Sequence, residues 1–481
     1  MQAIALIADS HLAVPPDEAF WLFGRGGQSG WLLGAACDAV RPGVAVSLRL
    51  PAGLGSPDAI DMLGRIGACV PGRLIEIVHD QPWQGRLRLK FKPAAGGTRF
   101  SVSAELDADG LAWLMDRRGA PRADRGQGGI GSVPGDVHRL GLLTSKSGPG
   151  AVFAIACDYL ARLAVEEINA DGGLRGKPVS LVVRDDATDS GRAGLEAGRL
   201  AAAGCRAIVA SVTSASFEAA QRTLARDGTL LLYPLLNEGG AAGGNVLRWG
   251  ERPLDQVQAV AGPMMKGTGS RHWYLVGNDY SWSHGAHLAA VRAIESAGGQ
   301  VVGDVFTPLG TTDFSKVIDG IRHSRAALIM SSLVGADEVA FERQAWSSGL
   351  RQNCEVLSLA LEESTRERVG DDASTGIWAA FGYFEAIEDA GNRELCRRYR
   401  KAYGRWAPPI STFAESVYEA ILLYASAVRG AGDDQSVVVR RLQHGRASMP
   451  RGPVEAAGPD RMSQRLRVAR AVPGGFQLLG D

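Results

Sequence analysis

The feature that most constrains the fold is a ten-residue run at residues 168–177, Ile-Asn-Ala-Asp-Gly-Gly-Leu-Arg-Gly-Lys. A helical apolar pattern precedes the run and a short β-like run follows it, with another β-like run before the helix. Together they make one βαβ unit. We expect Asn169 to end the helix, and Gly172, Gly173 and Gly176 to supply the positive φ angles that reverse the chain.

The same alternation of β-like and helical runs continues through residues 138–481 and predicts parallel sheets with helices on both faces. The predicted strands are 140–144, 179–184, 207–211, 230–233, 272–277, 301–306, 327–332, 355–360 and 377–381. The predicted helices are 153–169, 190–203, 216–226, 285–297, 314–323, 337–347, 394–403 and 413–427. These strands are too many for one sheet, so two lobes are expected. Lobe 1 takes about 138–255 with parts of 405–481, and lobe 2 about 270–400.

Residues 1–120 have a different pattern and predict a small α+β domain with an antiparallel sheet. Two alternating runs, 86–91 and 100–106, are joined by a glycine-containing turn and indicate a β-hairpin. A helical pattern over 57–69 has Ser56 as its predicted N-cap. The region resembles a PAS-like sensor domain, and a domain used for packing or dimerisation is an equal alternative. Residues 121–137, rich in Gly, Arg and Pro, are predicted to be a linker.

Composition and charge indicate which kinds of partner, cysteine chemistry and cellular location to expect. Lys plus Arg and Asp plus Glu both number 52, so the formal net charge is zero and neither nucleic acid nor an anionic membrane is favoured as a partner. The 6 Cys form no C-x-x-C pair and are interpreted as buried free thiols. The N-terminal stretch has no basic segment and Asp9 interrupts its apolar run, so no secretory signal is predicted and a cytoplasmic location is expected.

Candidate binding residues follow three predicted strands, where ligands bind in doubly wound sheets. The three segments are 210–216 (Ala-Ser-Val-Thr-Ser-Ala-Ser), 233–239 (Tyr-Pro-Leu-Leu-Asn-Glu-Gly) and 277–283 (Gly-Asn-Asp-Tyr-Ser-Trp-Ser). Hydroxyls stand before predicted helices, and aromatic side chains could form the walls of a small pocket. Each residue taken singly could instead be an N-cap or a core residue. The three segments together favour a cleft.

These segments, with 168–177, Leu333-Val334-Gly335 and Pro450-Arg451-Gly452-Pro453-Val454, resemble the amide- and urea-binding branch of the type I periplasmic-binding proteins. The resemblance runs from about 139 to 479. It implies the two-lobed α/β fold with two doubly wound parallel sheets, a small polar organic ligand, no cofactor, no metal and no catalysis. The ligand-binding residues that it predicts are Ser214, Thr213, Tyr233, Leu235, Tyr280, Trp282, Val212 and Gly335.

Three positions depart from the family pattern and predict a wider, more apolar pocket. Val212 stands in place of an aromatic residue, Leu235 in place of a small polar residue and Asn237 in place of Tyr. A larger amide, a branched amino acid or another small metabolite therefore stays open as the ligand.

The first functional hypothesis is a cytoplasmic amide or urea sensor that regulates a partner by lobe closure. The resemblance implies an RNA-binding antitermination regulator as that partner, and we expect a homo-oligomer. The alternative is the solute-binding component of an ABC transporter for amides, urea or branched-chain amino acids. An enzyme ranks last, because the chain has no G-x-S-x-G motif. His284 and His287 could form a metal pair, but no third ligand is visible nearby.

Overall fold

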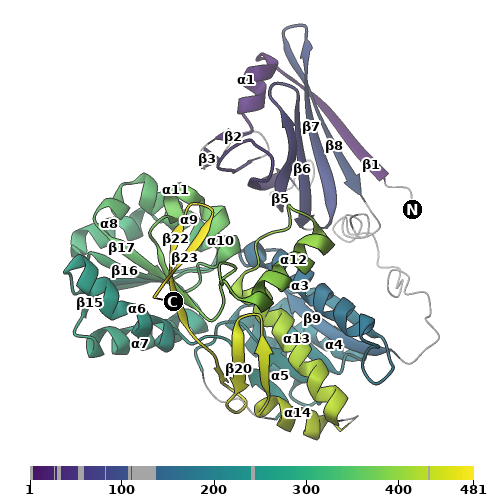
Figure 1. Ribbon diagram of the computed structural model, residues 1–481. Coiled ribbons are helices and arrows are strands. Elements are labelled where there is room, and N and C mark those ends of the chain that lie inside the picture. Colours follow the sequence, from purple (N-terminus) through teal and green to yellow (C-terminus); the bar gives the residue numbers. More distant parts are fainter. Residues whose placement is uncertain are drawn as a thin grey trace. The chain divides into compact units, whose positions relative to one another are not determined.

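The structure is a computed structural model that describes residues 4–25, 28–29, 34–51, 59–81, 83–106, 110, 137–239, 244–431 and 434–480. The chain divides into two compact units, Met1–Gly135 and Asp136–Asp481 (Figure 1). Of the predicted linker 121–137, only residue 137 lies among the described residues.

The first unit is built on one antiparallel sheet of six strands in the order β1-β8-β7-β6-β5-β4. Its strands are β1 (Ile4–Leu12), β4 (Ala45–Pro51), β5 (Ala59–Val70), β6 (Leu74–Gln81), β7 (Gly85–Ala94) and β8 (Gly97–Leu106). A short helix, α1 (Pro16–Trp21), and a small ribbon of β2 (Gly24–Arg25) and β3 (Gln28–Ser29) complete it. Strands β4 to β8 each pair with the next one along the chain, and the predicted hairpin of β7 and β8 is confirmed. The resemblance to a PAS-like domain stays a prediction.

The helix predicted over 57–69 is wrong, because the described part of that segment is strand β5. Apolar side chains alternate along it, and Met62 and Ile66 are buried in the core of the unit. Strands β4 and β6 pair with its two edges, and this sheet pairing overrides a weak helical pattern. The predicted cap, Ser56, lies outside the described residues.

Lobe 1 of the second unit has a parallel sheet in the order β10-β9-β11-β12-β13. Its strands are β9 (His138–Thr144), β10 (Val179–Asp185), β11 (Ala207–Ser211), β12 (Leu230–Tyr233) and β13 (Val246–Arg248). The helices that follow these strands are α3 (Ala151–Ala170), α4 (Ser190–Ala202) and α5 (Ser214–Leu224). All the predicted strands of this lobe are confirmed, and only β13 was not predicted.

Lobe 2 has a seven-stranded sheet in the order β15-β14-β16-β17-β18-β22-β23. The parallel strands are β14 (His272–Asn278), β15 (Gln300–Thr307), β16 (Leu328–Ser332), β17 (Glu355–Ser358) and β18 (Trp378–Phe381). The helices are α6 (Pro253–Thr268), α7 (Ser281–Ser296), α8 (Ser315–Ser324), α9 (Ala336–Ser347), α10 (Glu363–Val369) and α11 (Asp371–Ser374), with a 3-10 turn at Leu350–Gln352. The sheet is not wholly parallel as predicted, because β22 (Arg467–Val472) pairs antiparallel with β18 at its edge, and β23 (Gly475–Leu479) pairs antiparallel with β22.

Three chain segments cross between the lobes (Figure 1). The first leads from β13 to α6 and the second from β18 to α12 (Ala390–Tyr403) and α13 (Thr412–Ala431), which pack on α3 of lobe 1. After α14 (Gln435–Gln443), a small sheet of β19 (Arg446–Met449), β20 (Gly452–Ala456) and β21 (Met462–Ser463) leads to the third crossing, into β22. The predicted return of the late helices to lobe 1 is confirmed.

The glycine-rich turn after α3 has the predicted backbone, since Gly172, Gly173 and Gly176 have φ angles of 84°, 75° and 77°. Asn169 acts differently from the prediction. It lies inside α3, and its side chain pairs with both the N–H and the carbonyl of Val179 at 2.7 and 2.9 Å. Its amide thus joins the helix end to the start of β10.

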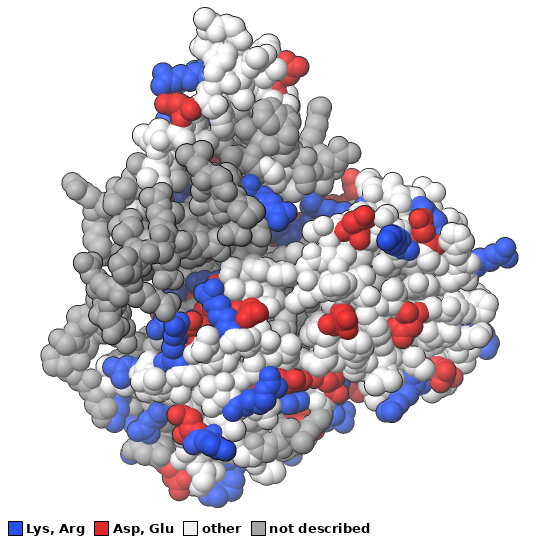
Figure 2. All heavy atoms as spheres, turned by 180° about the vertical axis from the view of Figure 1, so that it is seen from behind, with Lys and Arg blue, Asp and Glu red and all other residues white. Residues whose placement is uncertain are grey.

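None of the described helices is long and apolar enough to cross a membrane. On the face seen in Figure 2, basic and acidic side chains are interspersed. The six cysteines are free thiols as predicted, four of them buried and two half-buried.

Candidate functional site between the two lobes

A cavity lies between the lobes of the second unit, next to the carboxyl ends of β11, β12, β14 and β16. Its lining residues are Phe153, Val212, Thr213, Ser214, Tyr233, Leu235, Leu236, Tyr280, Trp282, Val334, Gly335, Ala360 and Phe413. The eight ligand-binding residues predicted from the sequence are all among them. The structure thus brings the predicted residues together, while their contact with a ligand stays a prediction.

Five helices begin at this cavity. Each contributes a lining residue at or near its first position: Phe153 in α3, Thr213 before α5, Tyr280 before α7, Gly335 before α9 and Phe413 in α13. The first N–H groups of a helix have no partner within it and carry partial positive charge. Among the described residues that line the cavity, none has a charged side chain. The helix N-termini therefore contribute partial positive charge to a cavity whose described lining residues carry none in their side chains.

The lobe 1 wall is a chain of hydroxyl contacts. Ser214 Oγ donates to Glu238 Oε2 at 3.0 Å and lies 3.4 Å from the hydroxyl of Tyr233. The Tyr233 hydroxyl donates to the Val212 carbonyl at 3.2 Å, and its ring stacks on Phe217 with centroids 4.3 Å apart. Burial raises the pKa of Tyr233 above its ordinary value, so the phenol stays protonated at neutral pH.

The lobe 2 wall includes two aromatic side chains at the start of α7. The rings of Tyr280 and Trp282 lie 6.2 Å apart, and burial raises the pKa of Tyr280 well above its ordinary value. Trp282 is 2% exposed, yet its indole N–H has no hydrogen-bond partner among the described residues. Buried donors in folded proteins are nearly always paired. The indole N–H of this lining residue is thus a buried donor that no described group of the protein uses.

The lobes touch each other on both sides of the cavity. The N–H of Ala336 in lobe 2 donates to the carbonyl of Pro149 in lobe 1 at 3.0 Å. Gly335 has a φ of +56°, and a Cβ there would lie 2.1 Å from the same carbonyl oxygen. A Cβ on Gly285 of α7 would lie 2.6 Å from the Glu238 Cβ. The free space open to a water-sized sphere is about 30 Å³, room for about two waters. A larger ligand therefore requires the lobes to separate.

Asp337 holds the loop of lobe 2 that makes this contact. Its carboxylate accepts hydrogen bonds from Asn278 Nδ2 and from the N–H groups of Gly310 and Thr311 at 2.7, 2.9 and 3.1 Å. Asn278 Oδ1 in turn accepts from the N–H of Val334 at 3.0 Å. Burial raises the pKa of Asp337 to about 6. The network fixes the backbone immediately before Gly335.

Some lining residues were not predicted, and one residue singled out for the pocket from the sequence is not among those that line it. The residues missed are Phe153, Leu236, Val334, Ala360 and Phe413. Phe153 and Phe413 contact each other with ring centroids 5.3 Å apart, although 260 positions separate them, and no local pattern predicts such a pair. Val334 and Leu236 stand beside predicted residues and could have been found from the strand-end rule. Asn237 does not line the cavity, because its buried amide bonds to the Gly250 carbonyl and the Gly239 N–H.

One set of side chains inside lobe 2 has the atoms of a Ser–His–Asp triad. His287 Nε2 lies 3.0 Å from Ser332 Oγ, and its Nδ1 lies 2.6 Å from Asp304 Oδ1. Ser332 and His287 are 0% and 2% exposed, and a Cβ on Gly277 would lie 2.4 Å from Ser332 Oγ. No substrate could approach this hydroxyl. His284, the other half of the predicted metal pair, bonds to Asp279, and no group of three potential metal ligands occurs among the described residues.

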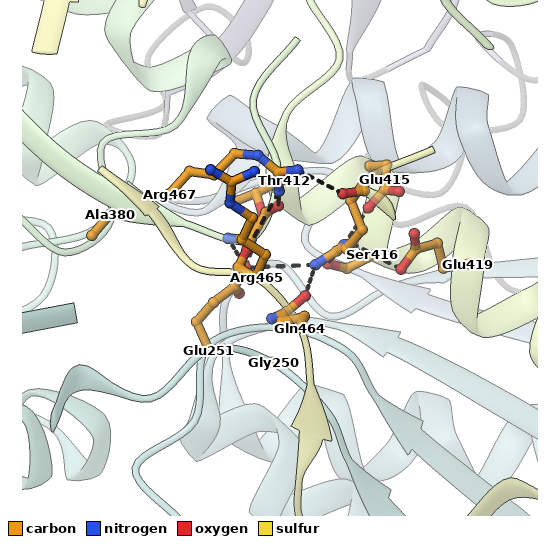
Figure 3. A network of polar contacts seen from close by, with 12 residues as sticks. Gly250, Glu251, Ala380, Thr412, Glu415, Ser416, Glu419, Gln464, Arg465 and Arg467 are labelled. Carbon is orange, nitrogen blue, oxygen red and sulfur yellow. Dashed lines mark hydrogen bonds and ion pairs between the residues drawn. The ribbon is translucent and has the colours of Figure 1, made fainter. Parts of the chain in front are cut away.

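A buried polar network joins the three crossing segments (Figure 3). Its centre is Arg451, which lies in the turn between β19 and β20 and whose side chain is 4% exposed. The guanidinium contacts Glu251 in the first crossing, Gln464 in the third, and Glu415 and Glu419 of α13. We call Arg451, Glu251, Glu415, Glu419 and Gln464 the hinge network.

The second crossing joins the hinge network through its backbone. Glu251 Oε1 accepts from the N–H of Gly382 at 2.9 Å, and Arg467 donates to the Gly382 carbonyl at 2.7 Å. Arg467 also donates to the Arg451 carbonyl at 3.0 Å. Burial raises the pKa of Glu419 well above its ordinary value, against the opposing charge of Arg451. Directional contacts thus bind all three crossings at one place.

A comparison with known protein families identifies the family to which the two-lobed unit belongs. A family model described as periplasmic binding protein matches residues 138–475. The chain belongs to the periplasmic-binding-protein family. The matched region comprises both lobes, the cavity and the hinge network, whereas residues 1–137 lie outside it.

Curated relatives with similar sequences are named as amino-acid-binding proteins. The Leu/Ile/Val-binding protein BraC3 of Rhizobium johnstonii is 27% identical over 64% of this chain and 83% of its own length. A leucine-, isoleucine-, valine-, threonine- and alanine-binding protein of Pseudomonas aeruginosa is 24% identical over 67% of this chain and 86% of its own length.

Solved structures share the fold at lower identity. A solute-binding protein of an ABC transporter from R. palustris, in complex with benzoate, has a TM-score of 0.65 and 19% identity, covering 72% of this chain and 96% of that one. The branched-chain amino acid transporter substrate-binding protein of Streptococcus pneumoniae, in complex with isoleucine, has a TM-score of 0.63 and 19% identity, covering 72% and 99%. The two-lobed α/β fold is therefore shown, and the amide- and urea-binding branch stays a prediction.

Proposed function

We propose that the second unit is a solute-binding protein that encloses a small carboxylate with an apolar body between its lobes. The observation that carries this proposal is the cavity itself, where five helix N-termini meet and none of the described lining residues has a charged side chain. Backbone N–H groups at helix N-termini favour an anionic group. Among the described lining residues a carboxylate would meet no acidic side chain, and the acidic group next to them is Glu238, which accepts from Ser214 Oγ.

The rest of the cavity favours an apolar ligand body. Val212, Leu235 and Leu236 on one lobe and Tyr280 and Trp282 on the other provide aliphatic and aromatic surface. Branched-chain amino acids and aromatic acids both combine a carboxylate with such a body, and both classes are ligands named for relatives or structural neighbours. The role proposed by analogy with these proteins is delivery of the solute to an ABC transporter.

Glu238 can distinguish the two ligand classes. Its carboxylate accepts from Ser214 Oγ at the edge of the cavity, and it would be the nearest counter-ion for an α-ammonium group. A Glu238→Gln substitution should weaken binding of leucine or isoleucine and leave benzoate binding almost unchanged. Equal loss for both ligands would contradict a role for Glu238 in recognising the ammonium group.

The experiment that tests the proposal is thermal unfolding of the full chain with a ligand panel. The panel contains leucine, isoleucine, valine, benzoate and 4-hydroxybenzoate, with leucinamide and benzamide as controls of the same shape that lack the carboxylate. A ligand that binds the folded state raises the melting temperature. The expected result is a shift with one or more carboxylates and a smaller shift with the matching amide. No shift with any carboxylate, or equal shifts for acid and amide, would contradict the proposal.

The second candidate is an amide or urea sensor in the cytoplasm that acts on a regulator protein. The observation that favours it is the first unit, an antiparallel sheet that lies outside the family match and could carry an output function. An uncharged cavity also suits a neutral amide, because hydroxyls supply both donors and acceptors. Stabilisation by acetamide or urea, with recovery of the protein in the cytoplasmic fraction, would support this candidate. Recovery in the periplasm would contradict it.

A further inference from the structure

A second cavity lies in the second unit, away from the lobe interface. It is a groove between the C-terminal half of α13, helix α14 and the β19–β20 hairpin, which lie beside one another (Figure 1). Its volume, measured as for the first cavity, is about 490 Å³. The space between the lobes is far smaller, about 30 Å³. The groove can thus hold a small organic molecule without any movement of the lobes.

The floor of the groove is apolar. Leu423 and Ala427 of α13, Leu442 of α14 and Ala456 of β20 line it, and each is less than 9% exposed. Met449 of β19 adds a partly buried thioether. Such a floor favours the apolar part of a ligand, because covering it removes hydrocarbon surface from water.

The rim of the groove is cationic. Arg440, Arg441 and His444 lie at the end of α14 and just beyond it, and Arg446 begins β19. No acidic residue is among the described residues that line the groove. Arg446 is paired with Glu455 at 2.6 Å, whereas Arg440 and Arg441 are exposed, and the charge of Arg440 contributes to the lowered pKa of Asp434. Asp434, six residues before Arg440, is the acidic group at the opposite end of α14, where it caps the helix.

We propose that this groove is a second ligand site, which takes a small organic anion with an apolar group. The anionic group pairs with Arg440 and Arg441, whose guanidinium groups bind planar carboxylates and sulfonates through paired N–H donors. The apolar group lies on the floor formed by α13 and the hairpin. This site is separate from the cleft between the lobes and does not depend on the ligand proposed for that cleft.

The groove is connected to the hinge network by two elements. The β19–β20 hairpin has Ala447 and Met449 in the groove wall and Arg451 in its turn. Helix α13 has Leu423 in the groove and, one turn earlier, Glu419 in contact with Arg451. An anion that holds the hairpin against α13 therefore also holds Arg451 in the hinge network.

The test compares two fluorescent probes that share an aromatic system and differ in charge. The probes are 8-anilinonaphthalene-1-sulfonate, an anion, and N-phenyl-1-naphthylamine, its neutral counterpart. Each is titrated into the full chain, into an Arg440→Gln/Arg441→Gln variant, and into an Arg222→Gln/Arg226→Gln variant. The last removes two exposed arginines from the end of α5, another lobe 1 helix, and serves as the matched control.

The expected result is tighter binding of the sulfonate than of the neutral probe, with one site per chain. The Arg440/Arg441 variant should lose about tenfold or more in sulfonate affinity and little in affinity for the neutral probe, while the control variant keeps both. The sulfonate should also raise the urea midpoint of the wild-type chain more than that of the Arg440/Arg441 variant. Equal affinity for the two probes, or equal losses in the two arginine variants, would overturn the proposal. Cleft ligands are assayed separately, so that failure here leaves the proposed function intact.

Discussion

The cleft and the hinge network lie in the same two lobes and use opposite kinds of chemistry. The cleft has hydroxyls, aromatic rings and helix N-termini, with no charged side chain among its described lining residues. The hinge network buries Arg451 with Glu251, Glu415 and Glu419. Where a ligand must be released, the protein relies on neutral donors and apolar walls. Where the crossing segments must keep one arrangement, the protein uses buried ion pairs, which are costly to separate.

This difference has an energetic basis. A buried ion pair contributes little net stability but is costly to break, because removal of one partner leaves the other charged and unsolvated. A neutral hydrogen bond to a ligand can be exchanged for one to water at small cost. The hinge network should therefore respond strongly to single substitutions, and the cleft should respond mainly in ligand affinity.

The largest effect is expected from Arg451→Gln. Three buried carboxylates would lose their common partner, which should lower the free energy of unfolding by about 3–5 kcal/mol. Urea unfolding of the full chain measures this loss. Arg446→Gln, on the same hairpin but with a side chain 77% exposed, is the control and should change stability by less than about 1 kcal/mol. Equal losses of unfolding free energy at Arg451 and Arg446 would contradict the greater importance assigned to the hinge network.

The next effect is expected from Gly335→Ala. A Cβ would lie 2.1 Å from the Pro149 carbonyl, at a φ of +56°, so the lobes could not meet as they do here. Strain of about 1–3 kcal/mol should weaken ligand binding roughly 10- to 100-fold. Calorimetric titration with the ligand found in the thermal panel measures the affinity. Gly349→Ala, at a φ of +76° with nothing closer than 3.8 Å, is the matched control and should leave affinity unchanged.

A smaller effect is expected from Ser214→Ala. This substitution removes the hydroxyl that donates to Glu238 and contacts Tyr233, and it should weaken ligand binding by about 1–3 kcal/mol if a ligand group also depends on it. Titration of the same ligand provides the measurement, and the melting temperature without ligand should change little. Unchanged affinity would mean that the ligand does not reach this wall of the cavity.

The smallest effect is expected from Trp282→Phe. The ring surface is mostly kept while the unpaired indole N–H is lost, so affinity should fall by about 0.5–1.5 kcal/mol. Because that N–H has no partner among the described residues, stability without ligand should stay equal or rise slightly. A loss of stability without a loss of affinity would show that the indole serves packing and not the ligand.

Sequence reasoning predicted most of the second unit because its signals are local. Most predicted strands of 138–381 are buried apolar runs, and Gly172 and Gly173 have the positive φ that the turn requires. The cavity residues Ser214, Tyr233 and Tyr280 could be predicted for a similar reason. They follow parallel strands, whose carboxyl ends meet at one edge of the sheet.

The remaining features depend on long-range pairing, which no local pattern contains. Strand β5 was predicted to be a helix, because its own residues do not reveal the pairing with β4 and β6 that makes it a strand. Phe413 enters the cavity only because α13 returns to lobe 1, and Arg451 meets Glu251 from 200 positions away. A lone buried arginine in a turn gives no sequence signal of the acidic residues that surround it.

The ribosome makes the strands that carry the cleft walls before it makes the segment that forms the third crossing. Strands β11, β12, β14 and β16, which bear most of the cleft walls, precede residue 333, whereas Arg451, Gln464, Arg467 and the β22–β23 edge of lobe 2 come more than a hundred residues later. A nascent chain thus has its binding surfaces well before it has the contacts that hold the two lobes in register. During synthesis the two lobes are connected before their relative orientation is fixed. Residues 446–479 then add the contacts that hold the cleft walls of the two lobes opposite each other.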